Sequence, residues 1–186
     1  MSDIVIDSFS KVYISYYQKS FRFAKSYVLD NLVAEDIASE SLIKLWDVMK
    51  TKSLAQDDVL PYLLTILKNK SLDYLKHQDV ERKAFDKITD WQQVDLDLRI
   101  NSLETFEVDS IYIKEMFSIV KESLKSLPDS TQRVFKMSRF QNKSNKEIAA
   151  AMGITEKGVE FHITKTLKVL RVALKDYLPL FYFFFL

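Results

Sequence analysis

Six residues near the C-terminal end of the sequence have side chains suited to reading the edges of DNA bases. Lysines can neutralise phosphates or reach guanine edges, and a glutamate can accept a hydrogen bond from the amino group of cytosine. A phenylalanine ring and a threonine methyl group can meet the methyl group of thymine. These candidates are Lys157, Glu160, Phe161, Thr164, Lys165 and Lys168. The alternative is an ordinary helical hairpin with a solvated charged face.

The stretch NKEIAAAMGITEKGVEFHI contains the local signals of two helices joined by a very short turn. Ser144 and Glu147 have the spacing of a capping box, which predicts a helix start. Gly153 can adopt the left-handed backbone that ends this helix, and Thr155 can cap the next one. This arrangement predicts a helix-turn-helix, whose second helix carries the six candidates into the major groove.

A second candidate face lies in the stretch LKNKSLDYLKH, which has the pattern of an amphipathic helix. Four of its residues share much of one polar side. They are Lys68, Asn69, Asp73 and Lys76. An asparagine can read a base edge while lysines hold phosphates, so the face suits single-stranded nucleic acid. The alternative, a simple solvated face, stays open.

A third candidate surface lies in AEDIASESLIKLWD, where acidic residues accompany large apolar ones. Asp36 and Glu40 lie largely off the apolar stripe, close to Leu42 and Trp46. Such a surface suits docking on a basic partner protein. The alternative is that the carboxylates match the dipole at a helix N-terminus. The spacing does not separate the two interpretations.

Composition predicts an all-α protein with neither metal nor cofactor. The 186 residues include only 2 glycines and 3 prolines, so long helices with short connections are expected. There is no cysteine, and the 2 histidines are far apart, which argues against a metal centre. No phosphate-binding glycine loop or nucleophile elbow occurs. We therefore expect no enzymatic reaction and no small-molecule substrate.

The charges divide the chain into parts. Residues 77–115 carry 5 basic and 10 acidic side chains, whereas residues 125–176 carry 11 basic and 5 acidic ones. We expect one small helical domain at residues 1–77, an acidic linker at 78–110 that docks only in part, and a second helical domain at 111–177.

The ends of the sequence bear on localisation. Residues 178–186, LPLFYFFFL, form an apolar tail that is too short for a membrane span of roughly 20 residues. We expect the tail to pack on the last helix or on a partner, with contact to a membrane as the alternative. The sequence starts without the pattern of a signal peptide, so a cytoplasmic protein is expected.

The three surfaces, in this order, resemble the extracytoplasmic-function class of the sigma-70 family, which are bacterial transcription initiation factors. AEDIASESLIKLW resembles region 2.2, which binds the clamp coiled coil of core RNA polymerase. YLLTILKNKSLDYLK resembles region 2.3–2.4, which melts and reads the −10 promoter element. The segment from LPDSTQ to VLR resembles region 4, which reads the −35 element. The resemblance implies two helical domains and promoter DNA as a partner.

The resemblance also implies roles for particular positions. Asn69 matches an asparagine that helps to form a base pocket for the −10 element, and residues 50–58 match the loop that holds the flipped base. Asp36 and Glu40 match acidic positions that face the clamp. In the second helix of the helix-turn-helix, Glu160, Phe161, Thr164 and Lys165 match positions that contact bases or phosphates. The linker matches the connector that threads toward the RNA exit path.

Two departures from the family pattern refine these expectations. Glu160 and His162 stand where many members have arginines, so the −35 sequence is expected to differ from the common one. The form GVEFHI resembles members that are paired with membrane-anchored anti-sigma factors. The alternative function is a stand-alone helix-turn-helix regulator, a repressor or activator dimer, which leaves residues 1–76 without a role.

Overall fold

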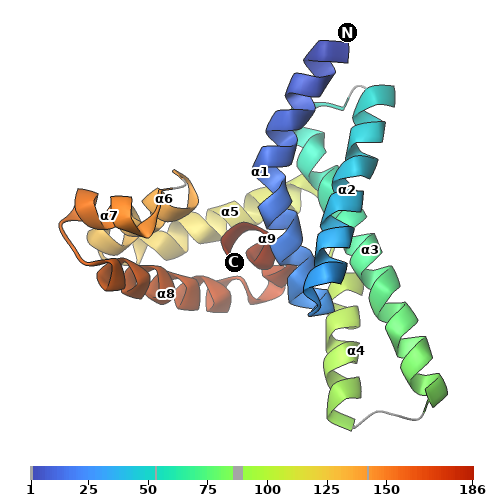
Figure 1. Cartoon of the computed structure of the whole chain (residues 1–186). Coiled ribbons are helices and arrows are strands. Elements are labelled where there is room, and N and C mark those ends of the chain that lie inside the picture. Colours follow the sequence, from blue (N-terminus) through green and yellow to red (C-terminus); the bar gives the residue numbers. More distant parts are fainter. Residues whose placement is uncertain (1, 53, 86–89, 142) are drawn as a thin grey trace. The chain divides into compact units, whose positions relative to one another are not determined.

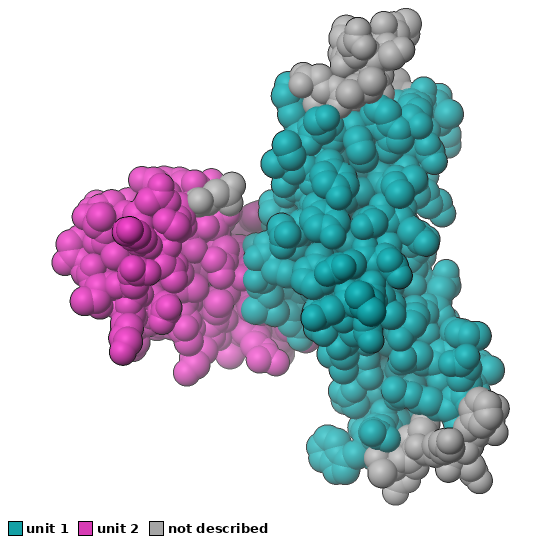
Figure 2. All heavy atoms as spheres, viewed as in Figure 1, with its two compact units in different colours: residues 1–112, 182–184, 186 teal, residues 113–181, 185 magenta. Residues whose placement is uncertain are grey.

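The structure is a computed structural model that describes residues 2–52, 54–85, 90–141 and 143–186, with only the backbone at residues 2–8, 84, 85 and 90. Every regular element among the described residues is helical, which confirms the all-α prediction. The chain forms two compact units (Figure 2). Unit 1 contains residues 1–112, 182–184 and 186, and unit 2 contains residues 113–181 and 185.

Unit 1 is built on three long helices, which are α1 (Ser2–Val28), α2 (Asn31–Thr51) and α3 (Gln56–Phe85). Helix α2 packs on both α1 and α3, and α1 also contacts α3 (Figure 1). The turn between α1 and α2 is sharp because Leu29 has a positive φ of 62°, and the Asp30 side chain then caps α2. The fully buried side chains include Phe23, Leu42, Leu45, Leu63 and Leu67.

The segment predicted to be a linker at residues 78–110 is largely part of unit 1. Helix α3 continues through residue 85, and α4 (Asp90–Glu104) returns along it (Figure 1). Leu96 and Leu103 are fully buried, and the Arg99 guanidinium donates to the Tyr27 carbonyl at 2.5 Å. The physical reason is an apolar stripe at Leu96, Ile100 and Leu103, whose helical spacing is obscured in the sequence by the acidic residues between them.

Unit 2 contains most of α5 (Ser110–Lys125), followed by α6 (Asp129–Arg139), α7 (Asn145–Met152) and α8 (Glu156–Ala173). Helices α6, α7 and α8 contact one another in pairs. The core between them consists of Val134, Ile148, Ala149 and Val159, with Met137 and Ile163 packed against it. Each helix of this trio therefore buries one apolar face and leaves the other face to solvent.

The apolar tail forms the short 3₁₀ helix η1 (Lys175–Tyr177) and α9 (Leu178–Phe185). In unit 1, the Phe183 ring lies 6.1 Å from that of Tyr16 and 6.4 Å from that of Phe23. In unit 2, the Phe185 ring lies 5.9 Å from that of Phe135. The tail was expected to pack on the last helix or on a partner, whereas the ring contacts of Phe183 are with α1 and that of Phe185 is with α6. No described helix is long and apolar enough to cross a membrane.

Candidate nucleic-acid interfaces

The entry into α8 is fixed by three local devices that the sequence predicted. Ser144 and Glu147 form a capping box, in which Glu147 Oε2 accepts from the Ser144 N–H at 2.8 Å. These hydrogen bonds lower the pKa of Glu147. Gly153 has a φ of 65°, and Thr155 Oγ1 accepts from the Gly158 N–H at 3.1 Å. Helices α7 and α8 therefore form the expected helix-turn-helix, with the first turn of α8 at its exposed end.

His162 lies on the opposite side of α8 from most of its charged neighbours. Its Nδ1 atom is 2.9 Å from the hydroxyl of Thr131 on α6, and Thr131 is 1% exposed. Because a buried hydroxyl needs a partner, this hydrogen bond joins α6 to α8. His162 thus supports the packing of the helix-turn-helix. The sequence did not reveal this role, because the partner lies 31 residues away.

All six candidates for DNA contact on α8 are exposed. Phe161 is 63% exposed, which is unusual for an aromatic ring on a polar face. Four of the six recur at three- and four-residue spacing and so share one stripe. They are Lys157, Phe161, Thr164 and Lys168, with Glu160 and Lys165 beside them. None of their charged groups pairs with another residue that the structure describes, so phosphates and base edges can reach them.

On the candidate face of α3, three of the four residues are exposed, and the two lysines contact other residues of the chain. Asn69 and Asp73 are exposed and lie one helical turn apart. Lys76 is also exposed, but its Nζ lies 2.6 Å from Glu104 Oε1 on α4. Lys68 is half-buried and donates to the Phe106 carbonyl oxygen. The two lysines of this face are therefore already in contact with oxygen atoms of the chain itself.

A cavity of about 420 Å³ lies where α1, the end of α2 and the start of α3 meet. Its walls include Leu54 and Gln56 from the loop that the resemblance predicts to hold a flipped base; residue 53 of that loop lies outside the described residues. The other lining residues are Lys11, Val12, Ser15, Tyr16, Met49 and Val59. The sequence could not indicate the wall from α1, because it lies some 40 residues from the loop in the chain.

Asn69 is too far from this cavity to share one base with it. Val59 in the cavity wall and Asn69 are ten residues apart on α3. At a rise of 1.5 Å per residue, this places them roughly 15 Å apart along the helix. The two positions to which the resemblance gives roles in base capture, Asn69 and the loop at residues 50–58, therefore lie at separate places along α3. A strand that visited both would have to run along α3.

The exposed face of α2 differs from the predicted docking surface in one residue. Asp36 and Glu40 are exposed as expected, but Leu42 is fully buried and does not lie on this face. Leu42 follows Ala38 by four residues and precedes Leu45 by three, which places it on the buried stripe. The exposed apolar residue is Ile43, which is 58% exposed. The sequence pattern contained this signal, because Ile43 follows Asp36 by seven residues.

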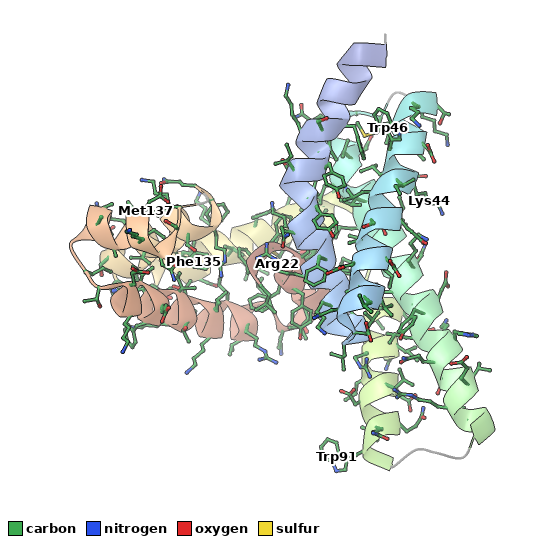
Figure 3. All side chains as sticks on the ribbon, viewed as in Figure 1. Arg22, Lys44, Trp46, Trp91, Phe135 and Met137 are labelled. Atoms are coloured by element: carbon green, nitrogen blue, oxygen red, sulfur yellow. The ribbon has the colours of Figure 1, made fainter. Side chains whose placement is uncertain are left out.

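Trp46 lies at the edge of the α2 face near the end of the helix (Figure 3). Its ring is 4.6 Å from that of Phe9 on α1, and the Lys50 ammonium lies 4.7 Å above it. The side chain is therefore half-buried, so that only part of it is open to a partner. The exposed stripe of α2 consists of Leu32, Asp36, Glu40, Ile43 and Asp47.

Comparison with protein families assigns both units. Residues 12–80 match sigma-70 region 2, and residues 118–170 match sigma-70 region 4. The first match contains the α2 face, the α3 face and all of the residues given for the cavity wall except Lys11, and the second contains the helix-turn-helix. No curated protein matches the chain. The chain belongs to the sigma-70 family of transcription initiation factors, in its extracytoplasmic-function class. It binds core RNA polymerase and directs it to promoters.

Proposed function

We propose that the two units divide promoter recognition between them, with α8 reading the −35 element as duplex DNA and α3 capturing an open strand of the −10 element. The observation that carries the proposal is the α8 stripe, in which the exposed Lys157 and Lys168 flank Phe161 and Thr164 on a helix that follows a helix-turn-helix turn. Phosphate contacts by the lysines position the helix, and Glu160, Phe161 and Thr164 select bases.

At the −10 element, the cavity and Asn69 act on different nucleotides. An extruded base enters the cavity beside Leu54 and Gln56, and a second base meets the Asn69 amide farther along α3. Opening the duplex costs a few kcal/mol, and the binding of extruded bases offsets part of this cost. The separation of roughly 15 Å between the two sites corresponds to a strand that follows the helix.

The exposed stripe of α2 is the proposed site for the clamp coiled coil of the polymerase. It combines Asp36 and Glu40 with the apolar Ile43, which suits a basic partner with an apolar contact at its centre. Joining both DNA-binding units to one polymerase raises the effective concentration of the second contact after the first has formed. Each DNA contact is therefore expected to be weak in the free chain.

A reconstituted transcription system tests the proposal. The chain is combined with core RNA polymerase, and the starts of the transcripts are sequenced to find a shared pair of upstream motifs. Asn69→Ala should reduce strand opening, measured by permanganate reactivity of thymines, more than it reduces promoter binding. Asn101→Ala, an exposed asparagine on α4, serves as the matched control and should affect neither. Tight binding of isolated operator fragments without polymerase would instead support a stand-alone regulator.

A membrane-anchored anti-sigma factor stays a proposed partner, and the cytoplasm stays the proposed location. The first rests on the resemblance of GVEFHI to members regulated in this way. The second rests on the partnership with RNA polymerase, together with the finding on membrane-spanning helices given above. Co-purification of the tagged chain from membranes, compared with a form that carries substitutions in GVEFHI, tests whether this segment selects the regulator.

A further inference from the structure

The residues that end α4 lie on the two lysines of the proposed −10 face. Glu104 forms an ion pair with Lys76, with 2.6 Å between the charged atoms. Two residues later, the Phe106 carbonyl oxygen accepts a hydrogen bond from the Lys68 ammonium. The same ammonium lies 6.0 Å from the centre of the Phe106 ring. Both lysines are thus engaged by one short segment, residues 104–106.

Apolar burial holds this segment in place independently of its contacts with the lysines. Leu103 is fully buried, and Phe106 is 3% exposed. The Thr105 N–H donates to the Asn101 carbonyl, and the Phe106 N–H donates to the Leu103 carbonyl. By contrast, the side chains of Lys76 and Glu104 are 53% and 44% exposed. Exposed ion pairs contribute little to stability, so Lys76 can exchange Glu104 for another anion.

The groups on this segment are the chemical equivalents of those on a nucleic-acid strand. The Glu104 carboxylate gives Lys76 an anionic oxygen, as a phosphate group would. Phe106 gives Lys68 a carbonyl oxygen and an aromatic ring, which resemble the oxygen acceptors and the ring of a base. We propose that Glu104 and the Phe106 carbonyl oxygen form an internal competitor, which occupies the lysines of α3 until the phosphates of single-stranded DNA replace these contacts. The inference rests on the proposed function of α3 and adds a form of regulation to that site.

Binding of a labelled single strand to the full-length chain tests the competitor. The probe is a fluorescein-labelled DNA oligonucleotide of about 12 nucleotides, within the range of strand lengths that such surfaces cover. Its affinity is measured by fluorescence anisotropy at low salt. Glu104→Gln should raise the affinity about two- to fivefold, the equivalent of one exposed ion pair. Glu107→Gln is the matched control, because it removes the same charge from an exposed residue that directly follows the segment.

The pairing is tested with Lys76→Ala, alone and combined with Glu104→Gln. If Glu104 acts through Lys76, Glu104→Gln should have no effect once Lys76 is alanine. In the unmodified chain, DNA should also shift the amide resonances of Thr105 and Phe106 in NMR spectra, because the lysines leave the oxygen atoms of Glu104 and Phe106.

The possible outcomes separate the two proposals. If Lys76→Ala lowers the affinity while Glu104→Gln leaves it unchanged, the α3 face stands and the competitor is refuted. An equal rise for Glu104→Gln and Glu107→Gln would also refute it, since net charge alone would then explain both. If the joint replacement of Lys68 and Lys76 by alanine leaves the affinity unchanged, the face itself does not bind single-stranded DNA, and the proposed function of α3 fails.

Discussion

The side chains of Thr131 and His162 meet at 2.9 Å between α6 and α8, although Phe161, the neighbour of His162, is 63% exposed. Two consecutive residues of α8 therefore have different surroundings. Phe161 faces solvent on the stripe that we propose to read DNA, and His162 connects α8 to α6. This explains why a histidine is compatible with a position where many family members have an arginine: here the side chain serves packing.

Replacing Thr131 with valine keeps the size of the side chain and removes the hydroxyl. The Nδ1 atom of His162 then loses its partner in a half-buried position, so unit 2 should lose roughly 1 kcal/mol or more of stability. Urea denaturation followed by circular dichroism measures the change. Ser130→Ala, an exposed position on the same helix, is the control and should change little. An unaltered midpoint for Thr131→Val would show that the hydrogen bond is energetically unimportant.

Substitutions on α8 should separate positioning from base selection. Lys168→Ala should weaken binding to all promoters alike and reduce the slope of log affinity against log salt by about 0.9, the value for one phosphate contact. Glu160→Ala should instead relax the preference at one base pair, a change of about 1–3 kcal/mol in discrimination. Selection of −35 sequences from a random library, in the presence of polymerase, distinguishes a uniform loss of affinity from a relaxed base preference. A uniform loss for Glu160→Ala would remove it from base recognition.

Neighbouring residues on α2 should give contrasting results. Leu42→Ala should destabilise unit 1 by about 2–5 kcal/mol, because it leaves a cavity in the core. Ile43→Ser should leave stability nearly unchanged and lower the affinity for core polymerase, since Ile43 lies on the exposed face. Thermal unfolding and a pull-down with core enzyme measure the two effects. Glu35→Gln is the control on an exposed position outside the stripe, and a loss equal to that of Ile43→Ser would refute the proposed face.

The capping box of α7 should make stability depend on pH in a definite direction. Hydrogen bonds from the Ser144 hydroxyl and N–H lower the pKa of Glu147 below its ordinary value of 4.5. The carboxylate therefore stabilises the folded state fully above that value, and the contribution disappears as the pH falls through the lowered pKa.

Glu147→Gln tests this dependence because glutamine also fits a capping box but does not titrate. The unmodified chain should be the more stable of the two at neutral pH, and the difference should vanish in acid. Unfolding midpoints recorded from pH 7 down to about pH 3 provide the comparison. Parallel curves for the two chains over this range would rule out a role for the Glu147 charge.

Local signals predicted the helix-turn-helix well because its determinants lie within a few residues of one another. Ser144, Gly153 and Thr155 each act on backbone groups at most four residues away. Hence the turn, the start of α8 and its outward face all followed from spacing. Similarity to a known family added the polymerase and the promoter, which spacing alone does not name.

Features that depend on distant contacts could not be predicted in this way. Leu96 and Leu103 are buried only because α4 folds back on the rest of unit 1. The acidic residues around them led to the prediction of a linker at residues 78–110. The cavity wall combines residues from α1 with residues from the loop before α3. In α2, Leu42 and Ile43 are adjacent in the chain but lie on different faces of the helix. The sequence-based prediction placed Leu42 on the exposed face, whereas the exposed residue is Ile43.

The return of α4 along α3 has a practical consequence for dissecting the protein. The family match in the first unit ends at residue 80, yet side chains from residues 96–106 complete the interior of that unit. A recombinant fragment cut at the end of the match would expose the surface that Leu96, Leu103 and Phe106 cover. A fragment that extends to residue 112 keeps these side chains and should be the better material for expression and for biophysical work.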